Sequence, residues 1–356
     1  MRPVLLSSLT AAVAAIGAAA VAGSPARGAS EAPAAPSAVS LYPNIVDTTL
    51  TARKSRLALE PPETTTYEEA ISTGEIVHIR LSNSFFPGGD AAAARQWADF
   101  FGSLLHGSEI SSLQVYVLTQ TEVENICGRN ALACYGSDQL FIPAADPDPD
   151  LTVESVAAHE YGHHVAEHLN NRPWVAIDWG PKRWASVEQV CANTRAGRFF
   201  PGAEDDTNYE VNPGEGWAET YRVLTEQRLG LPQAPWQVVS NDFFPNAASL
   251  AAAQADVATP WNGPTTTTLK GSVRKGAAVR TFSVKTPLDG QLRVTLTAAK
   301  GERVRLDVLS GSSTPLVRKL GRTISGSATI CGQRTLRVRV TRVAGSGAFR
   351  VAVTRP

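Results

Sequence analysis

The chain has 356 residues, of which 43% are hydrophobic and 19% are charged. This composition excludes a disordered or fibrous protein, and the length allows two domains with separate cores. The net charge of zero hides a division: residues 1–264 contain 15 basic and 30 acidic residues, a net charge of −15, whereas residues 265–356 contain 18 basic and 3 acidic residues, a net charge of +15.

Residues 1–29 are typical of an export signal. Arg2 precedes an apolar, Ala-rich run over residues 4–23, and small side chains at its end suit signal peptidase. A membrane anchor is the alternative, because the run is nearly long enough to span a bilayer. Alanine is only weakly hydrophobic and no basic residue follows at once, so we expect cleavage between about residues 23 and 31. The mature protein would then be secreted, extracellular or cell-wall associated, without an integral membrane segment.

The four cysteines fit an oxidising compartment. An even number of cysteines in an exported chain favours two disulfides over free thiols. Cys127 and Cys134 are close enough in sequence to close a short loop, which leaves Cys191 to pair with Cys331. No CxxC spacing occurs, so a structural zinc cluster is not expected.

The predicted elements follow in chain order. Residues 30–70 are rich in Pro and Ala and indicate a disordered linker or a short pro-region, and residues 71–260 read as an α+β domain. Its expected elements are strands at 74–86, 112–120 and 132–144 and helices at 88–107, 153–171, 181–195, 212–230 and 247–257.

The last part of the chain has a different pattern. Residues 261–268 form a Pro/Gly/Thr-rich linker, and residues 269–356 contain five alternating apolar segments separated by Gly-bearing turns. Such a pattern predicts an antiparallel β-sandwich.

The stretch HEYGH points to a metal site. His159 and His163 are separated by one helical turn and lie on one face, so their imidazoles can bind one cation. Glu160 is placed to accept a proton from a water activated by that metal. The alternative is a solvated helix with incidental histidines, but the stripe of mostly small residues at 158, 162, 165 and 169 predicts close packing. His164 and His168 point elsewhere and are expected at the surface or in hydrogen bonds.

The third ligand is sought downstream. The sequence lacks the Gly, His and Met of the metzincin pattern, whereas Glu215 and Glu219 lie one turn apart in NPGEGWAETY. One carboxylate can bind zinc and the other can orient a ligand histidine. Alternatively, Asn212 and Glu215 form a capping box and Glu219 pairs with Arg222. The acids at 204–206 are a further option for the metal, or a calcium-binding turn, although no specific calcium motif supports it.

HEYGH followed by NPGEGWAETY resembles the gluzincin group of zinc metallopeptidases. The resemblance implies one catalytic zinc ion bound by His159, His163 and Glu215, with Glu219 supporting a ligand histidine. It also implies a zincin-like fold in which the strand at 132–144 lies at the edge of the sheet, along the substrate cleft. Tyr209 is the candidate to steady the oxyanion, and a plain loop aromatic is the alternative. The C-terminal sandwich resembles the bacterial pre-peptidase C-terminal domain.

The resulting hypothesis is a secreted zinc metallopeptidase that acts on polypeptides, with Glu160 as general base. The alternative is a secreted binding protein with an inactive zincin fold. In either case the basic sandwich is a candidate to bind an anionic cell-wall polymer, although its charge could equally complement the acidic part of the chain. We expect no nucleic-acid partner.

Overall fold

The computed structural model describes residues 48–49, 62–203, 208–236, 239–311 and 314–356. The export signal, most of the predicted linker and the acids at 204–206 lie outside these residues. The described residues contain no helix that is long and apolar enough to cross a membrane.

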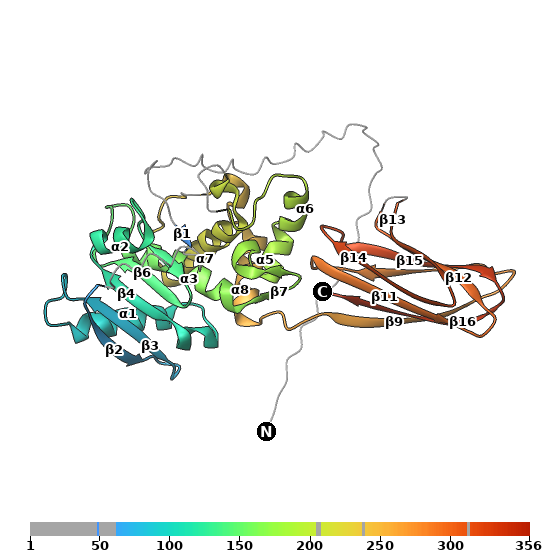
Figure 1. The fold of residues 1–356 in the computed structure, drawn as a ribbon, viewed down its shortest axis with the longest axis horizontal. Helices are drawn as coiled ribbons and strands as arrows, with labels where there is room; N and C mark the ends of the chain where they lie inside the picture. Colours follow the sequence, from blue (N-terminus) through green and yellow to red (C-terminus); the bar gives the residue numbers. More distant parts are fainter. Residues whose placement is uncertain (1–47, 50–61, 204–207, 237–238, 312–313) are drawn as a thin grey trace, which may run out of the picture. The chain divides into compact units, whose positions relative to one another are not determined.

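The first part of the described chain is built on a six-stranded mixed sheet with the order β1-β5-β6-β4-β3-β2 (Figure 1). Strands β3, β4 and β6 are parallel to one another, while β2 and β5 run antiparallel to their neighbours β3 and β6. Their bounds are β1 Thr48–Thr49, β2 Thr64–Ala70, β3 Ile76–Ser82, β4 Gln114–Leu118, β5 Cys134–Gly136 and β6 Gln139–Pro143.

Alternation along the strands separates two apolar layers. Leu140 and Ile142 of β6 belong to the main core, whereas Phe141 belongs to a smaller cluster on the opposite face. Helices α1 and α3 contribute Phe101 and Tyr161 to the main core, and α2 contributes Val123 to the smaller one. The helices span α1 Ala91–Ser103, α2 Gln120–Cys127 and α3 Val153–His168.

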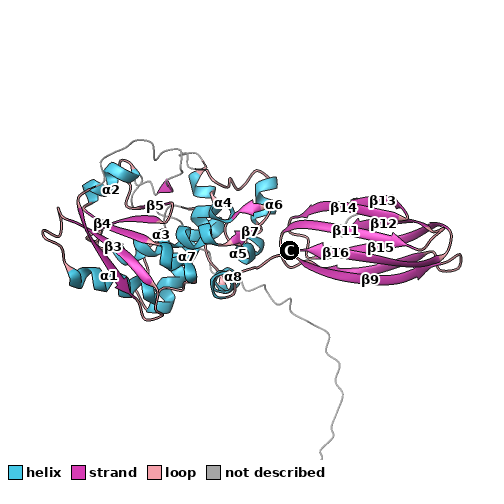
Figure 2. Ribbon diagram, turned by 60° about the horizontal axis from the view of Figure 1, so that its bottom comes forward, coloured by secondary structure: helices cyan, strands magenta, loops and turns pink. Residues whose placement is uncertain are grey.

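Short elements and two longer helices complete this part. Their bounds are η1 Ser108–Ser112, β7 Asn170–Asn171, β8 Trp174–Val175, α4 Ala176–Trp179, α5 Lys182–Val187, α6 Val190–Arg195, η2 Tyr209–Val211, α7 Pro213–Leu229, η3 Asn241–Phe243 and α8 Ala247–Ala258. Helix α7 packs against α3, as Figure 2 shows.

Residues 265–356 form two four-stranded antiparallel sheets with the orders β10-β15-β12-β13 and β14-β11-β16-β9. Every second residue of the central strands points into one apolar core, which includes Leu306 of β12 and Val338 of β15. This is the predicted sandwich pattern. The strands span β9 Thr265–Val273, β10 Val279–Lys285, β11 Gly290–Ala298, β12 Arg303–Leu309, β13 Pro315–Gly321, β14 Thr323–Ile330, β15 Thr335–Ala344 and β16 Gly347–Arg355.

Several expected boundaries are wrong. Thr64–Ala70 was assigned to the linker but forms β2, because Thr and Tyr favour a half-exposed strand even without an apolar face. Strand β9 begins at Thr265, inside the predicted linker at 261–268. The expected helix at 181–195 is broken at Gln189, whose φ of 54° is left-handed. Strand β5 is not the outer strand, because β1 pairs with it.

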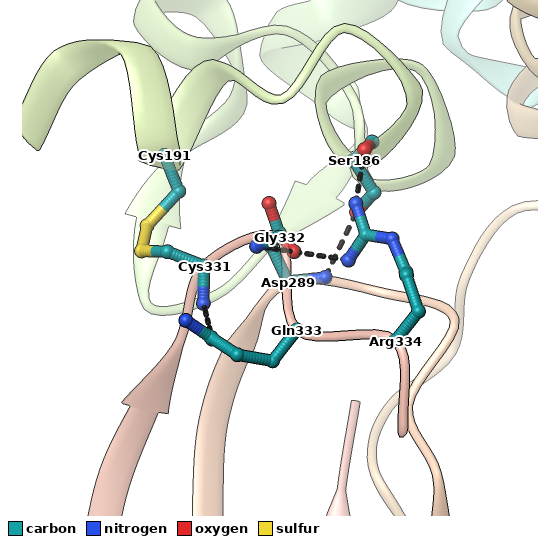
Figure 3. The surroundings of a disulfide bond; sticks show 7 residues. All are labelled: Ser186, Cys191, Asp289, Cys331, Gly332, Gln333 and Arg334. Carbon is teal, nitrogen blue, oxygen red and sulfur yellow. Dashed lines mark hydrogen bonds and ion pairs between the residues drawn. A yellow bond between two sulfur atoms is a disulfide. The ribbon is translucent and has the colours of Figure 1, made fainter. Parts of the chain in front are cut away.

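Both disulfides are present in the expected pairs, Cys127–Cys134 and Cys191–Cys331. The second joins α6 to the residue that follows β14. Figure 3 shows the contacts around it: the Ser186 hydroxyl accepts a hydrogen bond from the backbone N–H of Asp289, and the Arg334 guanidinium donates to the Ser186 carbonyl and the Asp289 carboxylate. The helical part and the sandwich are therefore connected by a covalent bond and by hydrogen bonds that satisfy charged groups.

Candidate metal centre

Helix α3 is positioned by its cap and by close packing against α7. The Thr152 side chain accepts a hydrogen bond from the Ser155 N–H at the start of the helix. At Gly162, an added Cβ would lie 2.9 Å from the Cα of Ala218, so a side chain here would force the two helices apart. The Trp217 indole also donates to the Gly162 carbonyl at 2.7 Å. The small-residue stripe therefore packs against α7, as its composition predicted.

His159, His163 and Glu215 meet between these helices. The Oε2 atom of Glu215 lies 3.3 Å from His159 Nε2 and 3.2 Å from His163 Nε2. Atoms bound to one tetrahedral zinc ion lie roughly 3.3–3.6 Å apart, which is close to these separations. The three residues are among the groups whose donor atoms are near enough to hold one metal ion.

The three donor residues are buried, with exposed fractions of 4% for His159, 0% for His163 and 1% for Glu215. Hydrogen bonding satisfies this arrangement poorly: among the described residues His163 Nδ1 has no hydrogen-bond partner, and His163 Nε2 has only the Glu215 carboxylate, at 3.2 Å. Burying such groups is costly unless a cation or hydrogen bonds compensate. The donor set therefore fits a metal ion in its composition and in its spacing.

Glu219 fixes the orientation of His159. Its Oε1 atom lies 3.2 Å from His159 Nδ1, which leaves Nε2 directed towards Glu215. Arg222 holds Glu219 in turn through Nε, at 3.2 and 3.1 Å from the two carboxylate oxygens. Arg222 also donates to Glu226, which accepts a hydrogen bond from the Ser155 hydroxyl. Glu219 therefore contacts both a histidine and an arginine, and its role in supporting a metal ligand stays a prediction.

The capping-box alternative for Glu215 is wrong. The Asn212 side chain caps α7 by accepting a hydrogen bond from the Gly214 N–H, but the backbone N–H of Asn212 donates to the Tyr209 carbonyl instead of to Glu215. Burial raises the pKa of Glu215, but the adjacent His163 and His159 outweigh that effect and lower it to about 2. Glu215 is therefore an ionised carboxylate at neutral pH.

The remaining candidates take different positions. Glu160 is buried on α3 beside His159, and Tyr209 is buried in η2 just before α7. The catalytic roles expected for both stay predictions. His164 is fully buried instead of lying at the surface, and its Nε2 lies 2.9 Å from the Glu109 carbonyl. The exposed His168 contacts Asp138.

Two cavities lie near the carboxyl ends of β4 and β6, with volumes of about 520 and 270 Å³. Both are lined by Phe85 and Ala144, and neither is lined by His159, His163 or Glu215. The smaller one reaches Glu154 in the first turn of α3. The smaller cavity therefore adjoins the start of the helix that carries the histidines, five residues before His159.

The contribution of Glu226 and Ser155 was missed from the sequence. Glu219, Arg222 and Glu226 are spaced i, i+3 and i+7, which places them on one face of α7 and could have indicated a buried ion network. Ser155 gives no such signal, because its contact with Glu226 depends on how α3 and α7 are packed.

No protein-family model matches the chain, and no curated protein matches it. Among solved structures, it is similar to the pre-peptidase C-terminal domain of a collagenase from Bacillus anthracis, with 18% identity over 24% of this chain and 87% of that domain and a TM-score of 0.21. It is also similar to PliG, a periplasmic inhibitor of g-type lysozyme from Aeromonas hydrophila, with 13% identity over 26% of this chain and 89% of the inhibitor and a TM-score of 0.21.

A third similarity extends over more of the chain. Aminopeptidase A from Legionella pneumophila is 10% identical over 77% of this chain, which spans 36% of that enzyme, with a TM-score of 0.21. At these scores the three similarities assign neither a fold family nor a function to the chain.

Proposed function

We propose that the chain is a secreted zinc metallopeptidase with His159, His163 and Glu215 as the zinc ligands. The observation that carries this proposal is that three buried donor atoms from two helices converge. Glu219 contacts Nδ1 of His159, the ring nitrogen that faces away from Glu215. Two imidazoles and one carboxylate are a donor set that catalytic zinc sites use. The two disulfides are compatible with export.

Zinc, when bound, would supply a Lewis acid that lowers the pKa of a water molecule towards neutrality and polarises the peptide carbonyl. Glu160, adjacent to His159 on α3, would accept a proton from that water as its oxygen bonds to the carbonyl carbon. The same carboxyl group would then pass the proton to the amine nitrogen as the C–N bond breaks. His163 and His159 would hold the ion, and Glu219 would keep the His159 ring in position.

Two substitutions test this proposal because they separate metal binding from proton transfer. Glu160→Gln keeps all three ligands, so its zinc content should equal that of the wild type. Its rate of casein hydrolysis should fall by several orders of magnitude. Glu215→Ala removes a ligand oxygen and should lose the metal as well as activity. Zinc analysis of the purified variants, combined with a chelator control on the wild type, provides the measurement. Full activity of Glu215→Ala would contradict the ligand assignment.

The competing proposal is a secreted binding protein that has the same fold but no activity. Glu160 favours the enzyme, because a site that only binds metal does not need a general base. A chain that contains zinc but hydrolyses neither casein nor a peptide library would support the binding protein. In that case the basic sandwich, with an anionic cell-wall polymer as partner, becomes the functional part.

A further inference from the structure

Helix α3 carries a second pair of histidines with the same spacing as the first. His164 and His168 are one turn apart, and this pair follows the pair His159 and His163 by five residues, which rotates it by about 140° around the helix axis. Asp138, in the turn between β5 and β6, faces them. Its Oδ1 atom lies 2.7 Å from His168 Nε2 and 3.5 Å from His164 Nδ1.

The tautomer of His164 leaves the lone pair of Nδ1 available to bind a metal ion. Its Nε2 lies 2.9 Å from the Glu109 carbonyl oxygen, which can only accept a hydrogen bond, so Nε2 carries the proton. The lone pair of a neutral ring is then on Nδ1, which faces Asp138. A backbone carbonyl that fixes a ligand histidine in this way is common at metal sites, and Glu219 has the same relation to His159.

Around His164 Nδ1 there are more hydrogen-bond acceptors than hydrogens to donate to them. The Tyr135 hydroxyl lies 3.1 Å from His164 Nδ1 and also contacts a carboxylate oxygen of Glu167, but it has one hydrogen for the two acceptors. Asp138 Oδ1 already accepts hydrogen bonds from the Ser112 hydroxyl at 3.1 Å and from His168 Nε2, so neither supplies a hydrogen to His164 Nδ1. A cation in the middle of these groups would satisfy lone pairs that the single hydroxyl hydrogen cannot.

We propose that Asp138, His164 and His168 form a second site for a divalent transition-metal ion, with Zn²⁺ as the best fit. Two imidazoles and one carboxylate suit such ions and do not suit Mg²⁺ or Ca²⁺, which prefer oxygen ligands. The three donor atoms are near enough to one another to hold one ion, which would displace the proton between Asp138 Oδ1 and His168 Nε2 and widen their 2.7 Å separation to the roughly 3.3 Å of two atoms bound to one zinc ion. Asp138 and His168 are partly exposed, so solvent can supply a fourth ligand. The ion would attach the C-terminal end of α3 to the β5–β6 turn.

Zinc content of the purified full-length protein tests the site, after equilibration with a slight excess of Zn²⁺ and gel filtration. We expect about two ions per chain in the wild type and about one in His168→Ala or Asp138→Asn. Both residues are partly exposed, so neither variant should fail to fold. His106→Ala removes a histidine outside both clusters and should leave the zinc content unchanged.

This test is independent of the proposed catalytic site. His163→Ala should also reduce the zinc content by one ion, but it should abolish casein hydrolysis, whereas His168→Ala should retain hydrolysis. A wild-type chain that binds one ion, lost in His163→Ala and kept in His168→Ala, would overturn the second site and leave the catalytic one in place. That result would mean that Asp138 only accepts a hydrogen bond from His168 Nε2.

Discussion

Glu219 contacts a histidine and an arginine at once, so we expect it to affect both metal binding at the candidate site and the stability of the fold. We predict that Glu219→Gln weakens zinc binding by about 10–100-fold, since the His159 ring loses the charged acceptor that orients it. The free energy of unfolding should also fall by about 1–3 kcal/mol, because Arg222 loses a charged partner. Zinc competition with a chelating dye and urea denaturation measure the two effects.

Glu226→Gln is the matched control. Glu226 also accepts a hydrogen bond from Arg222 but belongs to the network on the side away from His159. It should lower stability by a similar amount and leave zinc affinity unchanged. Equal losses of zinc affinity in the two variants would show that Glu219 acts through folding alone.

At the scale of single residues, the candidate metal cluster was predictable because its spacing is encoded within two helices. His159 and His163 differ by one turn, and so do Glu215 and Glu219. Asp138 was not predictable, because it comes from a turn and reaches His168 only through the packing of the hairpin against α3. The contact between Ser155 and Glu226 likewise depends on helix packing.

At the scale of elements, the buried Lys182 of α5 gives a pH-dependent contribution to stability. Its Nζ donates to the Arg172 carbonyl at 2.7 Å and lies 4.7 Å from the centre of the Trp261 ring. Burial lowers the pKa of Lys182 to about 8, although Asp289 and Asp256 act in the opposite direction. Between pH 8 and about 10.5 the unfolded chain therefore binds the proton and the folded chain does not.

We predict that the stability of the wild type relative to Lys182→Met increases from pH 8 to 10.5, by on the order of 3 kcal/mol, and is constant below pH 8. Taking the difference between the two proteins removes the titration of other groups. Thermal denaturation of both across this range is the measurement. A difference that does not change with pH would mean that Lys182 keeps its ordinary pKa in the folded protein.

Element types were predictable where periodicity was strong, as in α1, which begins after its cap Asp90, and α3. The secondary structure was not predictable where contacts with other elements stabilise a strand whose own sequence has no clear pattern. Strand β2 lacks an apolar face and is stabilised by pairing with β3. Strand β13 exposes Arg318, Lys319 and Leu320, so its sequence does not alternate between apolar and polar residues.

At the scale of the whole molecule, three of the 18 basic residues of the sandwich gather around one buried carboxylate. Asp307 is fully buried and pairs with Arg305, Arg318 and Arg339, so three guanidinium groups surround one carboxylate. Because one negative charge cannot neutralise three positive ones, this cluster keeps a net positive charge. It is the described feature that best supports a polyanionic partner.

We predict that the full-length chain binds an immobilised anionic polymer, with heparin as the probe, at low ionic strength and is released by salt. Replacing Arg318 and Arg339 by Gln should lower the salt concentration needed for elution. Arg95→Gln, which removes a positive charge from the first part of the chain, should not. A wild-type chain that does not bind at low salt would indicate that the basic charge only complements the acidic residues before 265.

The Cys191–Cys331 bond has a consequence for how the chain responds to cleavage by a protease. Residues 259–264 and the disulfide are two separate covalent routes between the helical part and the sandwich. A single cut in that segment would therefore release no fragment: the nicked protein should run as one intact band on a non-reducing gel and as two bands after reduction. Two bands without reductant would show that the bond does not form. The two parts of the chain would thus stay joined after the backbone between them is cut, as long as the disulfide is intact.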